Sequence, residues 1–337
     1  MPDSAAHFDV AGLGNALVDT LVTIDDQALV DTPYQRGIMH PVPHREWELA
    51  FERFQHPTMQ VHAGGSAANT IAGLGLLGAR TVFRGQVGDD ELGRRYGASL
   101  DEACGGHALA VTSEHPTGKC LALVSKSDSE RTMLVDLGAA PKLTGLGEFE
   151  THIRRSKVFH VTGYAFLEGP IRATAFQALD VARKAGVQIS LDVADPFVVA
   201  AIRDDVWRVL REYASIAFMN NEEAAALCGG MAPEQAVHEV AEAVETTVVK
   251  LGSRGSLVKQ RGVLTPIGIH RVQPMDTTGA GDAYAAGFLY GFVNDWSAAR
   301  CGRLGARVAA LTVAQLGGVF RDRAGLAAAV DACKEQP

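Results

Sequence analysis

The sequence has little that would place this protein outside the cytosol. Its five cysteines are dispersed, form no CxxC pair and are odd in number, which favours free thiols over a disulfide framework. The stretch 1–15 lacks a basic region followed by an apolar core, and no run reaches the ~18 apolar residues of a membrane span. We therefore expect a soluble cytoplasmic protein without a membrane partner.

Basic charge is also scarce. The sequence has 31 Lys and Arg against 39 Asp and Glu, which gives a formal net charge of −8. Nucleic-acid binding normally requires a concentrated basic face, so no nucleic-acid partner is expected. A small phosphorylated ligand is still compatible with this charge, because a few amides and one arginine can hold it.

Three common signatures are missing or misplaced. Gly118 and Lys119 lack the GxxxxGK[ST] spacing of a P-loop, and the 11 histidines form no HExxH pattern. Residues 73–78 satisfy GxGxxG but lie inside an Ala/Leu-rich helical stretch, not directly after a strand. A Walker NTPase, a zinc enzyme and an NAD-dependent oxidoreductase are therefore disfavoured.

The hydrophobic fraction of 47% lets the chain bury a large core, and no Pro/Ser-rich or charged linker divides it. We predict a single domain over residues 1–337 and leave monomer and homodimer both open. Short β-rich runs alternate with amphipathic helical stretches from residue 157 onward: strands at 157–163, 187–193, 215–219 and 246–251, helices near 170–185, 204–213, from about 233, 279–293 and 297–315. Such alternation predicts an α/β fold with a mainly parallel central sheet in a three-layer α/β/α domain.

The N-terminal half fits this scheme less well. Strand-like runs lie at 16–24 and on both sides of the polar turn 127–130, and we predict that they are antiparallel. An apparent α/β segment at 60–105 separates them. We therefore expect a small β-sheet lid over a ligand cleft, built from insertions near 14–45 and 112–140.

The strongest chemical signal is the sequence DTTGAGD at 276–282, which opens an apolar helical run. The amides of Gly279, Ala280 and Gly281 can approach an anion closely, and the positive end of the helix dipole favours negative charge there. Asp282 lies in the first helical turn, where it could accept a proton from a hydroxyl that attacks a γ-phosphate. The alternative is a capped turn in which Asp282 only complements the helix dipole.

This seven-residue pattern resembles the signature of the ribokinase-like (phosphofructokinase-B) carbohydrate kinase family. The resemblance implies ATP-dependent phosphate transfer to an alcohol, with Asp282 as base and the loop from Gly279 to Gly281 as anion hole. For many members it also implies a monovalent cation such as potassium, here near Asp276 and Thr278.

Two further segments are similar to the family's nucleotide-binding elements. The tetrad NNEE at 220–223 matches the NxxE pattern, which implies that Asn220 and Glu223 organise Mg²⁺ and phosphates, with Glu223 reaching the metal through water. The alternative is a helix N-cap with an acidic first turn. The segment 250–255 resembles the strand and turn beside the ATP phosphates, which implicates Gly252 and Arg254.

Two N-terminal motifs resemble the family's acceptor-binding elements. The motif AGGSAAN at 63–69 implies that Gly64, Gly65 and Asn69 contact hydroxyls of the substrate. Asn15 and Asp19, at the end of an apolar strand, resemble the hydroxyl-binding N-terminal motif, although an aspartate can also simply form a turn.

Within the family, the stretches 14–19, 61–70, 115–120 and 191–198 look closest to adenosine kinases. A nucleoside needs an apolar slot for its base, which these side chains could supply: Leu17, Cys120, Tyr164, Phe166 and Phe197. For the two phenylalanines, ordinary core packing is the alternative. Arg131, in the predicted lid, could reach the transferring phosphate, or it could be a solvated hairpin residue.

Two positions depart from the adenosine kinase pattern. Thr278 matches sugar kinases, where eukaryotic adenosine kinases typically have Asn, and Ala165 stands where they usually have an aromatic residue. Phosphorylation of the adenosine 5′-hydroxyl is the first expectation, and a ribokinase- or fructokinase-like sugar kinase is the second. A catalytically silent nucleoside-binding protein is the non-kinase alternative.

Overall fold

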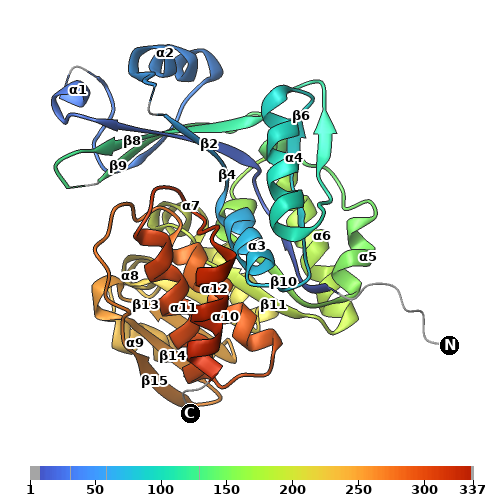
Figure 1. Cartoon of the computed structure of the whole chain (residues 1–337). Coiled ribbons are helices and arrows are strands. Elements are labelled where there is room, and N and C mark those ends of the chain that lie inside the picture. The colour runs from blue at the N-terminus through green and yellow to red at the C-terminus, as the bar shows by residue number, and fades with distance from the viewer. Residues whose placement is uncertain (1–7, 31, 58, 129, 335–337) are drawn as a thin grey trace.

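The computed structural model describes residues 8–30, 32–57, 59–128 and 130–334. Its largest element is an eight-stranded main sheet (Figure 1). In spatial order the strands are β15 (Val263–Ile267), β14 (Ser256–Gln260), β13 (Thr246–Lys250), β12 (Ile216–Asn220), β11 (Gln188–Asp192), β10 (Ser156–Thr162), β1 (Phe8–Leu13) and β5 (Thr81–Arg84). The six strands from β13 to β5 run parallel, and β14 and β15 extend the sheet by antiparallel pairing.

Both faces of the central parallel strands are buried, which explains why β10, β11 and β12 are largely apolar instead of alternating regularly with polar residues. On β12, Phe218 packs into the core on one face, while Ala217 and Met219 pack into the core on the other. One face is covered by α3 (Ser66–Leu76), α4 (Glu91–Cys104), α10 (Ala280–Val293) and α11 (Ala298–Val313), with α12 (Arg323–Lys334) packed outside α11.

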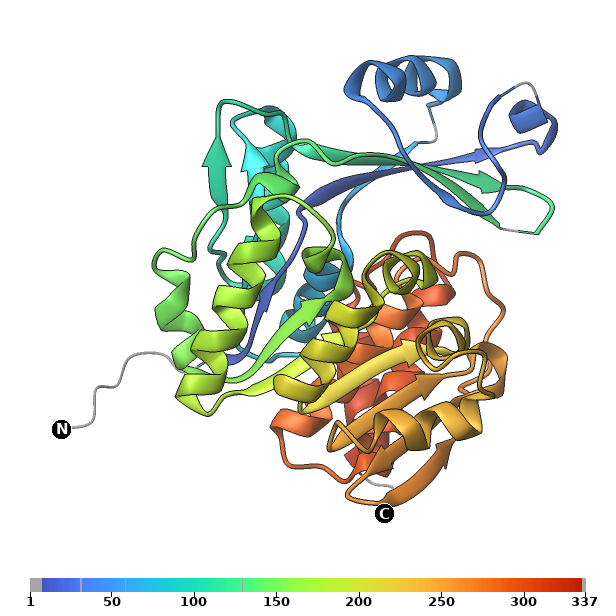
Figure 2. The same ribbon diagram turned by 180° about the vertical axis from the view of Figure 1, so that it is seen from behind.

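The opposite face, seen in Figure 2, carries the remaining helices of the main body. They are α5 (Phe149–Arg154), α6 (Pro170–Ala185), α7 (Pro196–Glu212), α8 (Asn221–Leu227) and α9 (Pro233–Val240). The predicted three-layer α/β/α domain is confirmed.

One helix differs from its expected bounds, since α7 begins at Pro196 instead of near 204. Asp195 caps it, accepting from the backbone N–H of Phe197, and the helix bends at Ile202, where the backbone is not helical.

A five-stranded sheet, which we call the lid sheet, stands beside the carboxyl ends of the parallel strands (Figure 1). Its order is β3 (Met39–Pro41), β9 (Arg131–Asp136), β8 (Gly118–Ser125), β2 (Leu17–Ile24) and β4 (Gln60–Gly64). The helices α1 (Gln27–Val30) and α2 (His44–Phe54) cover one face with Leu29, Trp47 and Phe54. The other face contributes Leu17, Asp19 and Cys120 to the cleft described below.

The lid sheet departs from the sequence prediction in two respects. The strands β8 and β9 are antiparallel as expected, but β2 and β8 pair in parallel along their whole length. Parallel pairing requires a long crossover, and more than 90 residues separate these two strands in the sequence. The strand β4, expected in the α/β segment, instead forms the edge beside β2. Ser129, in the predicted turn, and residues 1–7 lie outside the described residues.

A short parallel pair, β6 (Gln86–Gly88) and β7 (Ala110–Thr112), and three 3₁₀ turns complete the described elements. The turns are η1 (Ala140–Lys142), η2 (Gly163–Phe166) and η3 (Gly252–Arg254). None of the helices in the described ranges combines the length and apolar character needed to cross a membrane.

Candidate active site

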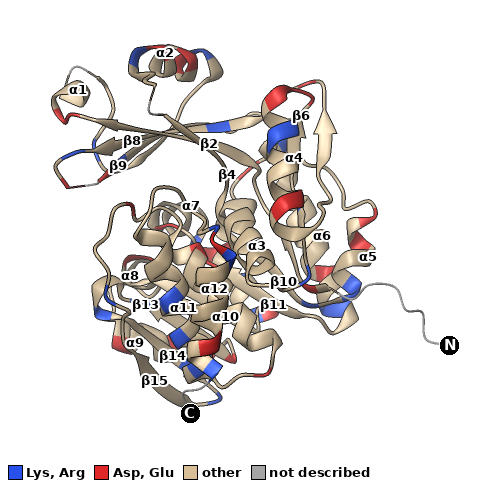
Figure 3. Ribbon diagram, viewed as in Figure 1, with Lys and Arg blue, Asp and Glu red and all other residues tan. Residues whose placement is uncertain are grey.

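The parallel strands end in a cleft of about 1530 Å³ between the main body and the lid sheet. The cleft is lined by Asn15, just after β1, and by the last residues of β10, β11, β12 and β13: Thr162, Asp192, Asn220 and Lys250. Ligands of open α/β sheets bind outside the carboxyl ends of the strands. Figure 3 marks acidic and basic residues together in this region, between α7 and α3.

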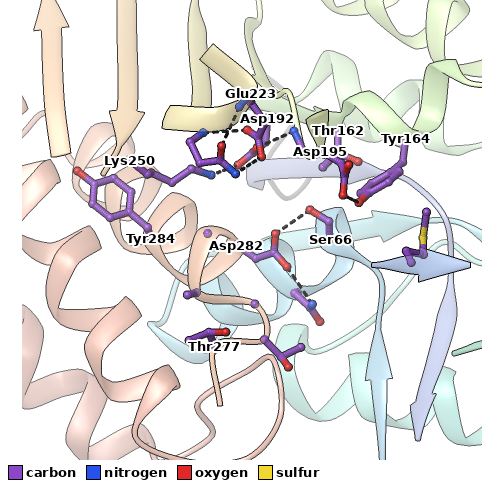
Figure 4. Close-up of a pocket in the computed structure, with 18 of the residues that line it drawn as sticks. Ser66, Thr162, Tyr164, Asp192, Asp195, Glu223, Lys250, Thr277, Asp282 and Tyr284 are labelled. Carbon is purple, nitrogen blue, oxygen red and sulfur yellow. Dashed lines mark hydrogen bonds and ion pairs between the residues drawn. The ribbon is translucent and has the colours of Figure 1, made fainter. Parts of the chain in front are cut away.

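Asp282 lies in the first turn of α10, as predicted, and its carboxylate faces the cleft (Figure 4). Ser66 Oγ donates to its Oδ1 at 2.7 Å, and Asn69 Nδ2 donates to its Oδ2 at 3.0 Å. Burial raises the pKa of Asp282, and the two hydrogen bonds partly oppose this rise. The carboxylate is therefore oriented by two donors and has a higher pKa than a surface aspartate.

The predicted anion loop precedes this carboxylate. Gly279 adopts φ +67°, and a Cβ atom there would lie 2.3 Å from the carbonyl oxygen of Gly318. Both facts require glycine at this position. A Cβ on Gly281 would lie 3.0 Å from Lys250 Nζ, so the lysine ammonium is close to the first turn of α10. An anion held by the loop would meet this positive charge as well as the helix N-terminus.

Lys250 and Asp192 form a buried ion pair, with Lys250 Nζ 2.8 Å from Asp192 Oδ2. Burial by itself lowers the pKa of Lys250, but the carboxylates of Asp192 and Glu223 outweigh it and raise the pKa overall. The lysine therefore stays charged at neutral pH. In β13 it pairs with Asn220 of β12, and both residues line the cleft.

Asn220 and Glu223 form a complete capping box at the start of α8. Glu223 Oε2 accepts from the Asn220 backbone N–H at 2.8 Å, and Glu223 Oε1 accepts from Asn220 Nδ2 at 2.6 Å. Burial raises the pKa of Glu223 to about 7, although Lys250 lowers it. Because both carboxylate oxygens already accept hydrogen bonds, these residues fit a Mg²⁺ ion that keeps its water shell better than one bound directly.

Asp276 is fully buried and organises the anion loop. Its Oδ1 accepts from the backbone N–H of Thr278 at 2.8 Å and from Thr278 Oγ1 at 2.5 Å, and its Oδ2 accepts from the Gly317 N–H at 2.9 Å. Arg131 Nε lies 3.8 Å from the same carboxylate. The Asp276 carboxylate thus ties together the loop, Gly317 and Arg131. The monovalent cation expected near Asp276 and Thr278 stays a prediction.

Arg131 extends from β9 of the lid sheet into the cleft, so it is not a solvated hairpin residue. Its guanidinium donates to Thr278 Oγ1 at 2.5 Å. This contact joins the lid sheet directly to the anion loop. It places a positive charge beside Thr278 and Asp276. The contact of Arg131 with the transferring phosphate stays a prediction.

The lid sheet also supplies Asp19, which faces the cleft. A Cβ on Gly64 would lie 2.1 Å from Asp19 Oδ2, and a Cβ on Gly65, at φ +91°, would lie 2.3 Å from the Asn15 carbonyl oxygen. Gly64 therefore leaves room for the Asp19 carboxylate, and Gly65 leaves room for the Asn15 carbonyl. Among the described residues, Asn15 Oδ1 is buried without a hydrogen-bond partner, and it lines the same cleft. Asp19 and Asn15 are acceptors placed to receive hydroxyl donors.

We expect the protonation of Asp19 to control acceptor binding. Burial raises its pKa to about 7. The positive charge of Arg131 lowers this pKa, and the negative charges of Asp282 and Asp276 raise it. Since the ionised form accepts hydroxyls, kcat/KM for the acceptor at saturating ATP should fall about tenfold per pH unit below about 7. The pKa values of Glu223 and Asp282 are raised as well, so comparison with Asp19→Asn is needed to identify the group. The assignment to Asp19 is wrong if this variant keeps the same acid limb.

The expected apolar slot is partly corrected by the structure. Leu17, Cys120, Tyr164 and Phe197 line the cleft, and Tyr164 donates its hydroxyl to Asp195 Oδ2 at 3.2 Å. Phe166, by contrast, is 1% exposed and its ring packs 5.1 Å from that of Phe176 in the core. Both Tyr164 and Phe166 belong to η2, and two residues in a 3₁₀ turn point to different sides. Phe166 is therefore a core residue.

The opposite end of the cleft suits a nucleotide base. Of the two residues predicted here, Gly252 lines the cleft. The side chain of Arg254 is exposed and does not line it. The loop 269–274 and one side of α11 complete this end, and α11 contributes only small or branched apolar side chains: Ala306, Ala309, Ala310 and Val313. Small side chains leave space for a flat ring.

Sequence reasoning missed Asp192, Lys250 and Ser66. Asp192 and Lys250 both end apolar parallel strands, a position from which polar side chains reach the ligand cleft. That signal was available for each residue alone. Their pairing was not, because 58 positions separate them.

Comparison with known proteins agrees with this geometry. Residues 46–322 match the profile described as pfkB family carbohydrate kinase. The chain belongs to this family. Membership explains why the signature loop, the capping box of α8 and the lid sheet occur together.

Relatives with different acceptors resemble this kinase. It is 31% identical to the solved adenosine kinase of Sinorhizobium meliloti, with a TM-score of 0.89 over 97% of this chain and 99% of that one. It is 28% identical to the adenosine kinase of Saccharomyces cerevisiae, over 90% of this chain and 94% of the relative. It is 30% identical to a 5-dehydro-2-deoxygluconokinase of Geobacillus kaustophilus, over 76% of this chain and 80% of the relative. The chain is thus an ATP-dependent phosphotransferase with a sugar or nucleoside acceptor.

Proposed function

We propose that this kinase transfers the γ-phosphate of ATP to the 5′-hydroxyl of adenosine, giving ADP and AMP. The observation that carries the phosphotransfer chemistry is the arrangement of Asp282. Its carboxylate lies in the first turn of α10, next to the glycine loop in sequence, and accepts hydrogen bonds from Ser66 and Asn69. A base and an anion site therefore share one helix N-terminus.

In this mechanism Asp282 accepts the proton of the acceptor hydroxyl as its oxygen attacks the γ-phosphorus. The amides of Gly279, Ala280 and Gly281 stabilise the charge that develops on the transferring phosphate, and Lys250 adds a fixed positive charge from β13. Mg²⁺, when bound with ATP, neutralises phosphate charge, and Asn220 and Glu223 are the residues that would hold it, through water.

The apolar part of the cleft supports a nucleoside as the acceptor. The lid sheet presents Leu17, Cys120 and Met133 toward the cleft, and the main body presents Tyr164 and Phe197. A free pentose or hexose is polar on all sides and gains little from such a wall, whereas a purine buries its faces there. Asp19 and Asn15 would bind the ribose hydroxyls beside it. Asn69 already donates a hydrogen bond to Asp282. We therefore propose that it orients this carboxylate, in preference to binding a substrate hydroxyl.

A sugar or sugar-acid acceptor is the second candidate. Thr278 matches the sugar kinase pattern of the signature, and the relative from Geobacillus kaustophilus acts, by its name, on 5-dehydro-2-deoxygluconate. The same base and anion loop would serve either acceptor.

A coupled ADP-release assay over adenosine, inosine, ribose, fructose and 5-dehydro-2-deoxygluconate tests the choice. We expect the highest kcat/KM with adenosine, and AMP as the product. A much higher kcat/KM with a free sugar or the sugar acid would overturn the nucleoside assignment, and no ADP release with any of them would favour a silent binding protein.

Two matched phenylalanine variants sharpen this test. Phe197→Leu removes a ring that lines the cleft and is 51% exposed, and we expect it to raise KM for adenosine about tenfold, roughly the effect of one aromatic contact. Phe166→Leu removes the core ring, so it should lower stability and leave KM nearly unchanged. Equal effects on KM would argue against a base slot at Phe197.

A further inference from the structure

Three side chains of α3 converge on Asp282. Besides the contacts of Ser66 and Asn69 with the carboxylate, Thr70 Oγ1 donates to the backbone carbonyl oxygen of Asp282 at 3.3 Å. Positions 66, 69 and 70 fall on one side of the helix, because spacings of three and four return to the same face. The first turns of α3 and α10 are therefore joined through one aspartate (Figure 4).

The contacts of Ser66 and Thr70 differ in what they can influence. Ser66 is half-buried, lines the cleft and donates to the carboxylate itself. Thr70 is 1% exposed and reaches only the main chain. Loss of the Thr70 contact would weaken the packing of the two helices, whereas loss of the Ser66 contact would also change the charge and orientation of the reactive group.

We propose that Ser66 is a positioning residue for phosphate transfer, which orients the Asp282 carboxylate toward the acceptor hydroxyl and stabilises its negative charge. This inference rests on the proposed role of Asp282 as the base. With Ser66 donating to Oδ1 and Asn69 to Oδ2, each oxygen keeps a free lone pair. The acceptor hydroxyl gives its proton to one of these oxygens while its own oxygen bonds to the γ-phosphorus and the bond to ADP breaks.

Other charged and titratable groups also act on Asp282. Asp192 raises its pKa and Lys250 lowers it, and Asp19 and Tyr164 interact electrostatically with the same carboxylate. All four stay in place when Ser66 alone is changed. A difference in the pH profile between wild type and a Ser66 variant therefore reports the serine contact.

The test compares Ser66→Ala with Thr70→Val as the matched control from the same helix face. A hydrogen bond to a charged group is lost in Ser66→Ala, so we expect kcat to fall about 10- to 100-fold with little change in KM. Its acid limb of kcat should move up by about one pH unit, because the carboxylate has lost a donor. Thr70→Val should lower the melting temperature and leave the acid limb where it is in wild type.

The outcomes separate this inference from the proposed function. If Ser66→Ala keeps the wild-type kcat and acid limb while Asp282→Asn is inactive, the role of Ser66 is refuted and Asp282 remains the base. If Asp282→Asn is active, the base assignment itself fails. Should Ser66→Ala not fold, Ser66→Cys keeps a side chain of similar size with a weaker donor, and a wild-type acid limb in that variant equally refutes the proposal.

Discussion

Asp282→Asn should reduce kcat by roughly 10²–10⁴-fold, the usual contribution of a general base. The substitution keeps the size of the side chain at the start of α10 but removes the proton acceptor. Ser66 can still donate to the amide oxygen. The amide of Asn69 must rotate to accept from the new nitrogen, since two N–H₂ groups would otherwise face each other at 3.0 Å.

We expect this variant to fold and to bind ATP at least as well as wild type, because it removes a negative charge near the phosphates. Calorimetric titration with ATP and steady-state kinetics measure the two quantities separately. Glu91→Gln is a matched control, since Glu91 is an exposed first-turn carboxylate of α4 that does not line the cleft. Near-normal kcat in Asp282→Asn would remove this residue from the mechanism.

Lys250→Met should lower both stability and turnover. The side chains of Lys250 and Asp192 are 14% and 5% exposed, and breaking a buried pair by removing one partner costs about 3–5 kcal/mol. Turnover should fall by roughly 10²–10³-fold, the scale expected when one charge-stabilising group is lost. Urea unfolding measures the first effect and kcat the second.

A double variant separates these two roles of Lys250. Asp192→Asn combined with Lys250→Met removes both charges of the ion pair, so we expect it to recover a large part of the stability lost in Lys250→Met. Turnover should stay low, because the positive charge beside Gly281 is still missing. If Lys250→Met loses stability but keeps its kcat, the lysine only supports the fold and does not act on phosphate.

The sequence predicted those features that depend on short spacings. The alternation of β-rich and helical stretches from 157 onward predicted four of the parallel strands, β10 to β13, and most of the helices between and after them. The seven residues of the signature placed the anion loop and Asp282 at the start of one helix, because a glycine-rich turn followed by an apolar helical run fixes that geometry locally. The tetrad at 220–223 likewise allowed a helix N-cap with an acidic first turn, and the structure shows this as a capping box within four residues.

Features that depend on pairing between distant segments were decided only by the tertiary structure. The sequence shows that β2 and β8 are strands, but the direction in which they pair depends on where the long crossover enters the lid sheet. Phe166 and Phe197 are both phenylalanines beside candidate ligand segments. The backbone of η2 directs the Phe166 side chain into the core, whereas Phe197, at the start of α7, lines the cleft.

In the active site, too, local features were predicted from the sequence, whereas contacts between distant elements were not. The sequence placed Asp282 and its glycine loop at one helix start, since residues within one turn of a helix have little freedom relative to each other, and the resemblance of this signature to a kinase family predicted phosphate transfer. The tertiary structure alone brought Ser66 of α3 against Asp282 of α10 and Lys250 of β13 against Asp192 of β11. Such contacts form because burial of both faces of the main sheet presses separate elements together, and buried polar groups must then find partners across the interface.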